Sequence, residues 1–91
     1  MKELGLLMEW TNRIEYIMAK ASLKAMGCVI DDERSGTIEL LGVDGIWRTY
    51  VAVVLQMPES IFKDFLEANN LNSEEHFPVE QLEGVTFYVN K

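Results

Sequence analysis

The stretch Ile46–Gln56 (IWRTYVAVVLQ) constrains the fold most, because it predicts a strand at the centre of a sheet. It is rich in β-branched and aromatic residues, and from Tyr50 to Leu55 it contains no charge, glycine or proline. Asp44 and Gly45 directly precede it, and an Asp-Gly pair between two apolar runs favours a tight type I′ hairpin turn. We therefore expect a hairpin that leads straight into this central strand.

The residues before the hairpin turn predict one long helix and two strands. From about Glu3 to Met26 apolar residues recur at the spacing of one helical face, and Gly27 suits the stop. Cys28–Glu33 and Thr37–Val43 predict strands joined by a turn at residues 34–36. The apolar helical positions are Leu7, Trp10, Ile14, Ile17, Met18, Ala21 and Ala25.

The residues after the central strand predict a second helix and a last strand. Pro58 is suited to the first helical position, the helix extends to about Ala68, and residues 69–71 resemble a left-handed cap with an apolar contact. Residues 72–76 predict a polar loop, residues 77–82 one helical turn, and Val85–Asn90 a strand. That strand could lie beside either the first or the third predicted strand.

These elements predict a single α+β domain spanning residues 1–91. The order α-β-β-β-α-β favours a two-layer sandwich, with a mainly antiparallel four-stranded sheet and both helices on one face. Nearly half of the residues are hydrophobic (48%), which is enough for one ordered core without a stapling metal or disulfide.

Alternation along the strands predicts a sheet face that the helices leave uncovered. Val51, Val53 and Leu55 would face the helices, together with Val85 and Phe87. Tyrosine and arginine are enriched at binding hot spots, so the opposite face predicts a surface for a partner protein or a second copy, although a plain solvated face explains the pattern equally well. The residues of this predicted surface are Glu39, Arg48, Tyr50 and Tyr88.

Charge narrows the class of partner. The net charge is −7, and residues 57–91 hold seven acidic and only two basic side chains. Direct DNA or RNA binding depends on Lys and Arg that neutralise phosphates, so this composition argues against it and against anionic membranes. The single Cys28 cannot form an internal disulfide, and no segment resembles a membrane span or a secretory signal, so we expect a cytoplasmic protein.

A second hypothesis uses the acidic residues themselves. A small acidic domain can present carboxylates in place of phosphates and occupy the nucleic-acid channel of a basic, nucleic-acid-handling protein. Inhibitors that bacteriophages encode against host defence nucleases, including anti-CRISPR proteins, are often built this way. The candidate residues are Asp64, Glu67, Glu74, Glu75, Glu80 and Glu83.

Catalytic and cofactor chemistry finds little support in the sequence. Cys28 and His76 are the only thiol and imidazole, and Cys28 would follow a helix C-terminus, which disfavours the thiolate. Residues 31–33 and 74–76 match no metal-ligand spacing, and no glycine pattern suits a phosphate. We therefore expect a non-enzymatic binding or regulatory protein without a cofactor or metal. A small-ligand pocket between helices and sheet, lined by Trp10, Met18, Trp47 and Phe65, is a third possibility.

Overall fold

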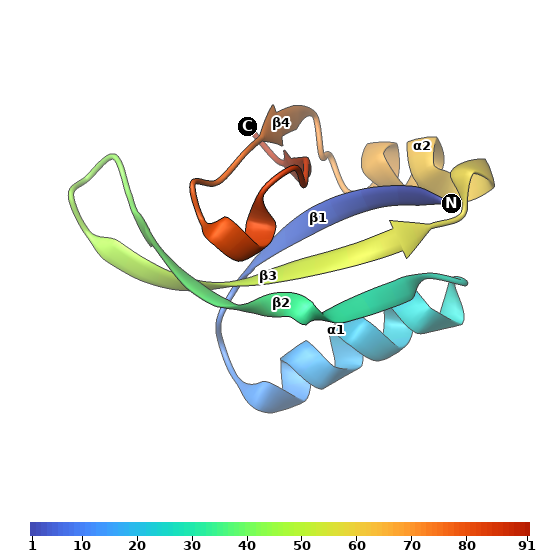
Figure 1. Cartoon of the computed structure of the whole chain (residues 1–91), viewed down its shortest axis with the longest axis horizontal. Helices are drawn as coiled ribbons and strands as arrows, with labels where there is room; N and C mark the ends of the chain where they lie inside the picture. The colour runs from blue at the N-terminus through green and yellow to red at the C-terminus, as the bar shows by residue number, and fades with distance from the viewer.

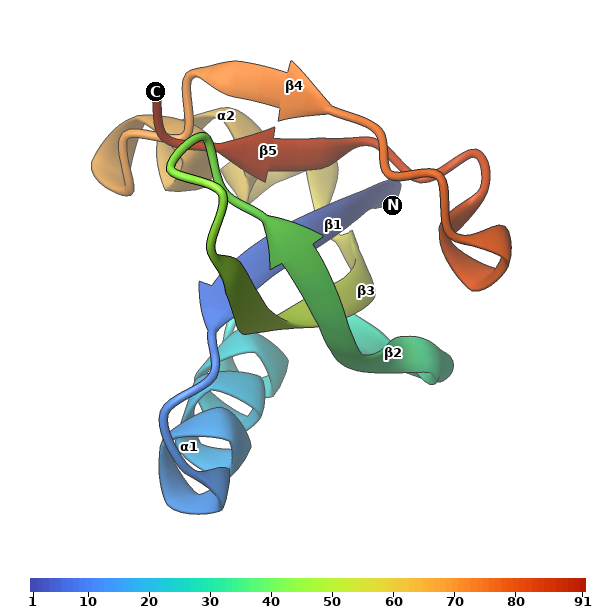
Figure 2. The same ribbon diagram turned by 90° about the vertical axis from the view of Figure 1, so that its left-hand side faces the viewer.

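The first strand of the chain lies in the middle of a five-stranded mixed sheet (Figures 1 and 2). The structure, a computed structural model, describes residues 1–91. The strand order is β2-β3-β1-β5-β4, and all neighbours are antiparallel except the parallel pair β1 and β5. The α+β class is confirmed, whereas the four-stranded sheet and the α-β-β-β-α-β order are wrong. The elements are β1 (Lys2–Glu9), α1 (Arg13–Ala25), β2 (Val29–Leu41), β3 (Trp47–Met57), α2 (Glu59–Ala68), β4 (Ser73–Glu75), the 3-10 turn η1 (Glu80–Leu82) and β5 (Phe87–Val89).

β1 occupies residues that the sequence predicted as the start of a helix. Leucine and methionine favour helices, but here the backbone pairs with β3 along the whole strand and with β5 at Gly5 and Leu6. Leu4 is fully buried as a result. The helix begins only after Asn12, whose side-chain oxygen accepts a hydrogen bond from the Glu15 N–H at 2.9 Å. Tertiary pairing therefore overrides local helix propensity up to this N-cap.

The side of α1 that packs against the sheet is the side that the sequence analysis expected to face solvent. Leu23 is buried and Tyr16 packs against the same core, while Ile14, Ile17 and Met18 are 70%, 53% and 63% exposed. The predicted apolar face of the first helix is thus the face that α1 presents to solvent.

β2 is one long strand rather than two strands joined by a turn. Residues 32–35 stand opposite Val53 in a bulge, where the pairing shifts between Asp31 and Gly36. The Ser35 hydroxyl accepts a hydrogen bond from the Val54 N–H at 2.9 Å and donates one to the Asp31 carbonyl at 2.7 Å. Because the hydroxyl replaces the missing ladder contact, the polar residues 34–36 bend the strand without reversing it.

The connection from β2 to β3 is a hairpin, as predicted, but its turn is not type I′. A type I′ turn needs positive φ at both central residues, and in this turn only Gly45 has one, at 78°. The Gly45 N–H donates to the Gly42 carbonyl at 3.0 Å, and the Gly42 N–H donates to the Ile46 carbonyl at 2.9 Å. The loop is therefore longer than the predicted turn, and β3 begins at Trp47.

Both faces of the sheet carry a buried core. The two helices pack on one face, as predicted, over a cluster that includes Val51, Val53 and Leu55. The opposite face, expected to be uncovered, is covered by residues 77–85, which bury Leu82 and Val85 against Ala52 and Val54. We call these the helix-side core and the loop-side core. The buried members of the loop-side core are Ile38, Ala52, Val54, Leu82, Val85 and Phe87.

The C-terminal third supplies the covering segment and two short strands. α2 spans the predicted residues, with Pro58 as its N-cap rather than its first helical residue, and Asn70 takes the expected left-handed conformation (φ 54°). The predicted polar loop contains β4, and the predicted helical turn is only the short η1. β5 is shorter than predicted and lies beside β1, a strand that the sequence analysis did not identify.

Candidate functional site

The exposed large apolar side chains all come from residues 1–47. Seven of the eleven fall into two groups. Three lie on the outward side of α1, and four lie at the end of the β2–β3 hairpin. Isolated exposed apolar residues are ordinary, but grouped ones mark surfaces that bind other molecules. The full set is Met1, Trp10, Ile14, Ile17, Met18, Met26, Val29, Leu41, Val43, Ile46 and Trp47.

Residues 41–47, which we call the hairpin end, carry four of these side chains on a short loop. Val43 is fully exposed and Trp47 is 64% exposed, and Figure 1 shows this end curving away from both helices. Leu41 and Trp47 are directly paired across the two strands, so their side chains share one face of the hairpin. Ile46 completes the apolar surface at the turn.

Polar contacts hold the hairpin end in one shape. The Asp44 carboxylate accepts hydrogen bonds from the Ile46 N–H at 3.1 Å and from the Arg48 guanidinium at 2.7 and 3.2 Å. The Arg48 hydrogen bond, helped by the Ile46 N–H, lowers the pKa of Asp44 below its usual value, and the same contact raises the pKa of Arg48. The charges of Asp44 and Arg48 thus neutralise each other, and the other large side chains of residues 41–47 are apolar.

The four residues predicted to share an uncovered sheet face do not share one. Arg48 and Tyr50 lie on the side of the loop-side core, where Tyr50 packs against the buried cluster. Glu39 pairs with Thr49, which places it on the helix side, and Tyr88 is buried in the helix-side core with its ring edge-on to Phe62. Strand alternation was assigned correctly within β3, but β2 at Glu39 and β5 at Tyr88 both face the opposite side to the one predicted. A common partner surface built from these four side chains is therefore wrong.

The six predicted acidic residues wrap around one end of the sheet rather than forming one flat surface. Asp64 and Glu67 lie on α2, which covers the helix side, whereas Glu80 and Glu83 lie at η1, which covers the loop side. Glu74 and Glu75 lie on the edge strand β4 between them, and Glu75 pairs with Lys91 at 2.5 Å. The other five carboxylates have no ion-pair partner.

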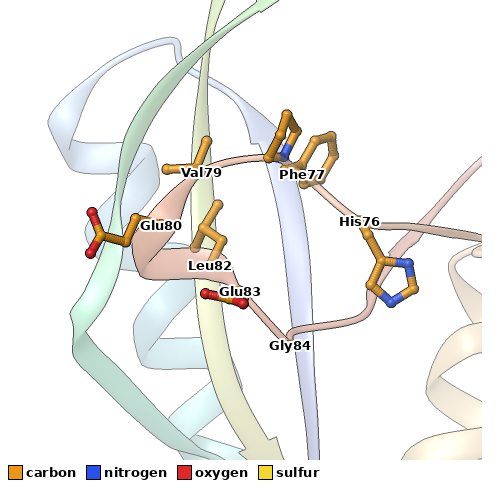
Figure 3. A pocket seen from close by; sticks show the side chains of 8 residues that line it. His76, Phe77, Val79, Glu80, Leu82, Glu83 and Gly84 are labelled. Carbon is orange, nitrogen blue, oxygen red and sulfur yellow. The ribbon is translucent and has the colours of Figure 1, made fainter.

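The hollow of the C-terminal loop brings no pair of reactive groups together. A hollow of about 430 Å³ is formed by residues 76–84, and Figure 3 shows His76 and Glu80 at opposite ends of this loop, pointing away from each other. The His76 ring lies 3.2 Å from the Thr86 hydroxyl, while Cys28 is buried in the helix-side core, where burial raises the pKa of its thiol. No three His, Cys, Asp or Glu side chains lie close enough to share a metal ion.

An apolar cleft of about 370 Å³ lies between α1 and α2, where a ligand pocket was considered. Phe65 lines it as expected, together with Leu23 of α1 and Leu6 of β1. Trp10, Met18 and Trp47 do not line it. The cleft is open to solvent on the helix side, and its polar lining groups are few.

The residues of the hairpin end were not identified from the sequence. Trp47 was considered only for the predicted ligand pocket, and the turn was interpreted solely as a connection. Comparison with known proteins does not add candidates, because no family model, curated protein or solved structure matches the chain. Neither helix is long and apolar enough to cross a lipid bilayer.

Proposed function

We propose that this chain is a small non-enzymatic binding protein that engages another protein through the hairpin end. The observation that carries the proposal is the combination of four exposed large apolar side chains with a loop that is braced internally by backbone hydrogen bonds and by the Asp44–Arg48 ion pair. Exposed apolar area costs free energy in water, so its retention on a well-braced loop favours a role in recognition.

The geometry of the loop suits binding because little order has to be gained on association. Gly42, Asp44 and Arg48 fix the loop through hydrogen bonds, which lowers the conformational entropy that a partner must overcome. Trp47 beside Leu41 offers a broad apolar surface, and a buried tryptophan is a frequent hot spot worth about 2 kcal/mol or more. Such a contribution corresponds to roughly a 30-fold change in affinity.

The test is capture of a partner from native lysate with matched variants. Wild-type protein, Trp47→Ser, Val43→Asp and the control Lys63→Ser, an exposed α2 residue without an ion pair, would be immobilised at equal density. We expect one protein to be retained by the wild type and the control and to be lost from both hairpin variants. Retention that is identical on all four proteins would contradict the proposal.

A second candidate function uses the acidic end of the sheet. It is favoured by a contrast in pairing, because four of the eight acidic side chains before residue 57 have basic partners (Glu3, Asp31, Asp32 and Asp44), whereas only Glu75 of the seven in residues 57–91 has one. We propose as the alternative that the acidic residues at this end contact a basic, nucleic-acid-handling protein in the way a nucleic acid does, as an anti-defence inhibitor of the anti-CRISPR type would. Its residues are Asp64, Glu67, Glu74, Glu80 and Glu83, with Glu75 beside Lys91.

The two candidates respond differently to salt and to substitution. Binding through carboxylates weakens as ionic strength rises, because the Debye length shortens to about 3 Å at 1 M salt. We expect the amide variant D64N/E67Q/E74Q/E80Q/E83Q to lose a basic partner while Trp47→Ser keeps it, if the alternative holds. A partner that survives 1 M salt and the amide substitutions rejects the alternative and leaves the hairpin end as the binding surface.

A further inference from the structure

The outward side of α1 is apolar along its whole length. A helix on a protein surface ordinarily turns charged residues to solvent, and α1 instead exposes Ile14, Ile17 and Met18 together with Ala21 and Ala25. At 100° per residue this group is centred nearly opposite Leu23 and Tyr16, which face the sheet. The exposure is therefore built into the helix and does not come from a tilted or loosely packed element.

The spacing of this side matches the contact line between two packed helices. Ile14, Met18, Ala21 and Ala25 follow one another by four, three and four residues, which is the 3.5-residue repeat of a paired helix. We call these four residues the α1 stripe. Its large side chains, Ile14 and Met18, occupy the N-terminal half, and its small ones, Ala21 and Ala25, occupy the C-terminal half. Two copies of the stripe that run in opposite directions would therefore place large side chains against small ones.

We propose that α1 pairs antiparallel with α1 of a second copy of the chain. A two-fold axis passing between Ala19 and Lys20 places Ile14 against Ala25 of the second copy and Met18 against Ala21 of the second copy. Each large side chain then meets a small one, as self-complementary two-fold interfaces require. Parallel pairing would place isoleucine on isoleucine and alanine on alanine, which leaves a gap over half of the helix.

The distribution of charge favours this occupant. The α1 stripe contains no charge, and of the two lysines on α1, Lys20 is bound to Asp32 at 2.6 Å while Lys24 has no ion pair. α1 lies by β2 at one edge of the sheet, whereas α2 and the edge strand β4 lie toward the other edge, as Figures 1 and 2 show. Pairing through α1 therefore keeps the acidic residues of α2 and β4 out of the contact between the copies, which avoids repulsion between like charges.

The residues of this pairing are separate from those of the hairpin end, so the pairing goes beyond the proposed function. Either proposal can be contradicted by experiment without affecting the other. A 13-residue helix is about 20 Å long, which gives an interface smaller than the roughly 800 Å² per partner of a stable complex. The dimer is consequently expected to be reversible and to depend on concentration, and it would present two hairpin ends at once.

Sedimentation equilibrium over a concentration series up to about 1 mM tests the pairing. The wild-type mass should rise from 10.4 kDa toward twice that value, Met18→Glu and Ala21→Glu should stay at the monomer mass, and Trp47→Ser should behave as the wild type. Circular dichroism confirms that each variant is folded, and both glutamates replace exposed residues. A wild type that remains monomeric throughout, or a dimer that both glutamates leave intact, overturns the proposal.

Cysteine cross-linking tests the register. A mixture of Ile14→Cys and Ala25→Cys chains under a mild oxidant should give a disulfide-linked dimer, whereas Ile14→Cys alone should give none. Cross-linking of Ile14→Cys with itself would show parallel pairing and overturn the assignment. Binding of anionic vesicles that is lost with Met18→Glu, in a chain that stays monomeric, would instead assign the stripe to a membrane surface and also overturn it.

Discussion

Gly5 lies directly beneath the ring of Phe87, and a Cβ placed on Gly5 would stand 2.5 Å from Cε2 of that ring. The two residues are also paired across the parallel strands β1 and β5, and Phe87 is fully buried. The glycine is therefore required by packing at the junction where the C-terminal strand joins the sheet.

Gly5→Ala should destabilise the protein by about 1–3 kcal/mol, the usual cost of overpacking a core. Gly36→Ala is the matched control, because Gly36 also lies in a strand but has no atom within 4 Å of the added Cβ and no positive φ. Urea unfolding followed by tryptophan fluorescence measures both. Equal stability of the two variants would show that Phe87 moves aside without cost.

Acidification should release the hairpin end below the ordinary titration range of aspartate. The Arg48 hydrogen bond lowers the pKa of Asp44, so the stabilising contact is present above the unfolded value of about 3.9 and is lost as pH falls through the lower folded value. The Ile46 amide resonance, followed by NMR against pH, reports the change. Asp44→Ala should remove the transition, and a transition that persists in this variant would assign it to another group.

Alkaline pH should weaken the fold through Tyr88. Burial raises the pKa of its phenol, so stability is fully present below the unfolded value of about 10 and is lost as pH rises through the folded value. Tyr88→Phe removes the ionising group while keeping the ring against Phe62. Between pH 9 and about 11 the variant should lose less stability in urea unfolding than the wild type, and parallel losses would contradict this assignment.

The Cys28 thiol should be protected from reagents until the protein unfolds. It is 6% exposed in the helix-side core, and burial raises its pKa, so little thiolate is available to react. Reaction with Ellman's reagent at neutral pH should be slower by about 10³-fold or more than in urea, because it requires the rare open state. Ser60→Cys, on the exposed start of α2, gives the fast rate of an open thiol in the same chain.

The strand β1 could not be separated from a helix by local pattern, although two signals were present. Leu4, Leu6 and Met8 alternate with Gly5 and Leu7, as a strand requires, but leucine and methionine lack the β-branching that marks strands. The capping pair of Asn12 and Glu15 marked the true helix start. By contrast, β3 and α2 have strong local signals, and their predicted bounds agree with the structure to within one residue.

The candidate surfaces were harder to predict because exposure depends on distant packing. α1 has apolar side chains on two sides, and periodicity alone cannot tell which side meets the sheet. Within each strand, Tyr50 and Tyr88 point to the side opposite their immediate neighbours, as the sequence indicates. Which side each strand presents depends on its pairing with β1, which lies between β3 and β5 and was not predicted. Tyr88→Lys, which would test a solvent-exposed tyrosine, is accordingly expected to unfold the protein by burying a charge.

The central position of β1 sets the order in which the sheet can be assembled during synthesis. The ribosome makes β1 before either of its neighbours, since β3 is in the second half of the chain and β5 lies close to residue 91. A nascent chain therefore carries an apolar strand with two open edges, and then with one, until β5 emerges. Any early stop in translation before Phe87 leaves Gly5 and Leu6 without their partners on β5, and such truncated chains are expected to need chaperones or to be degraded.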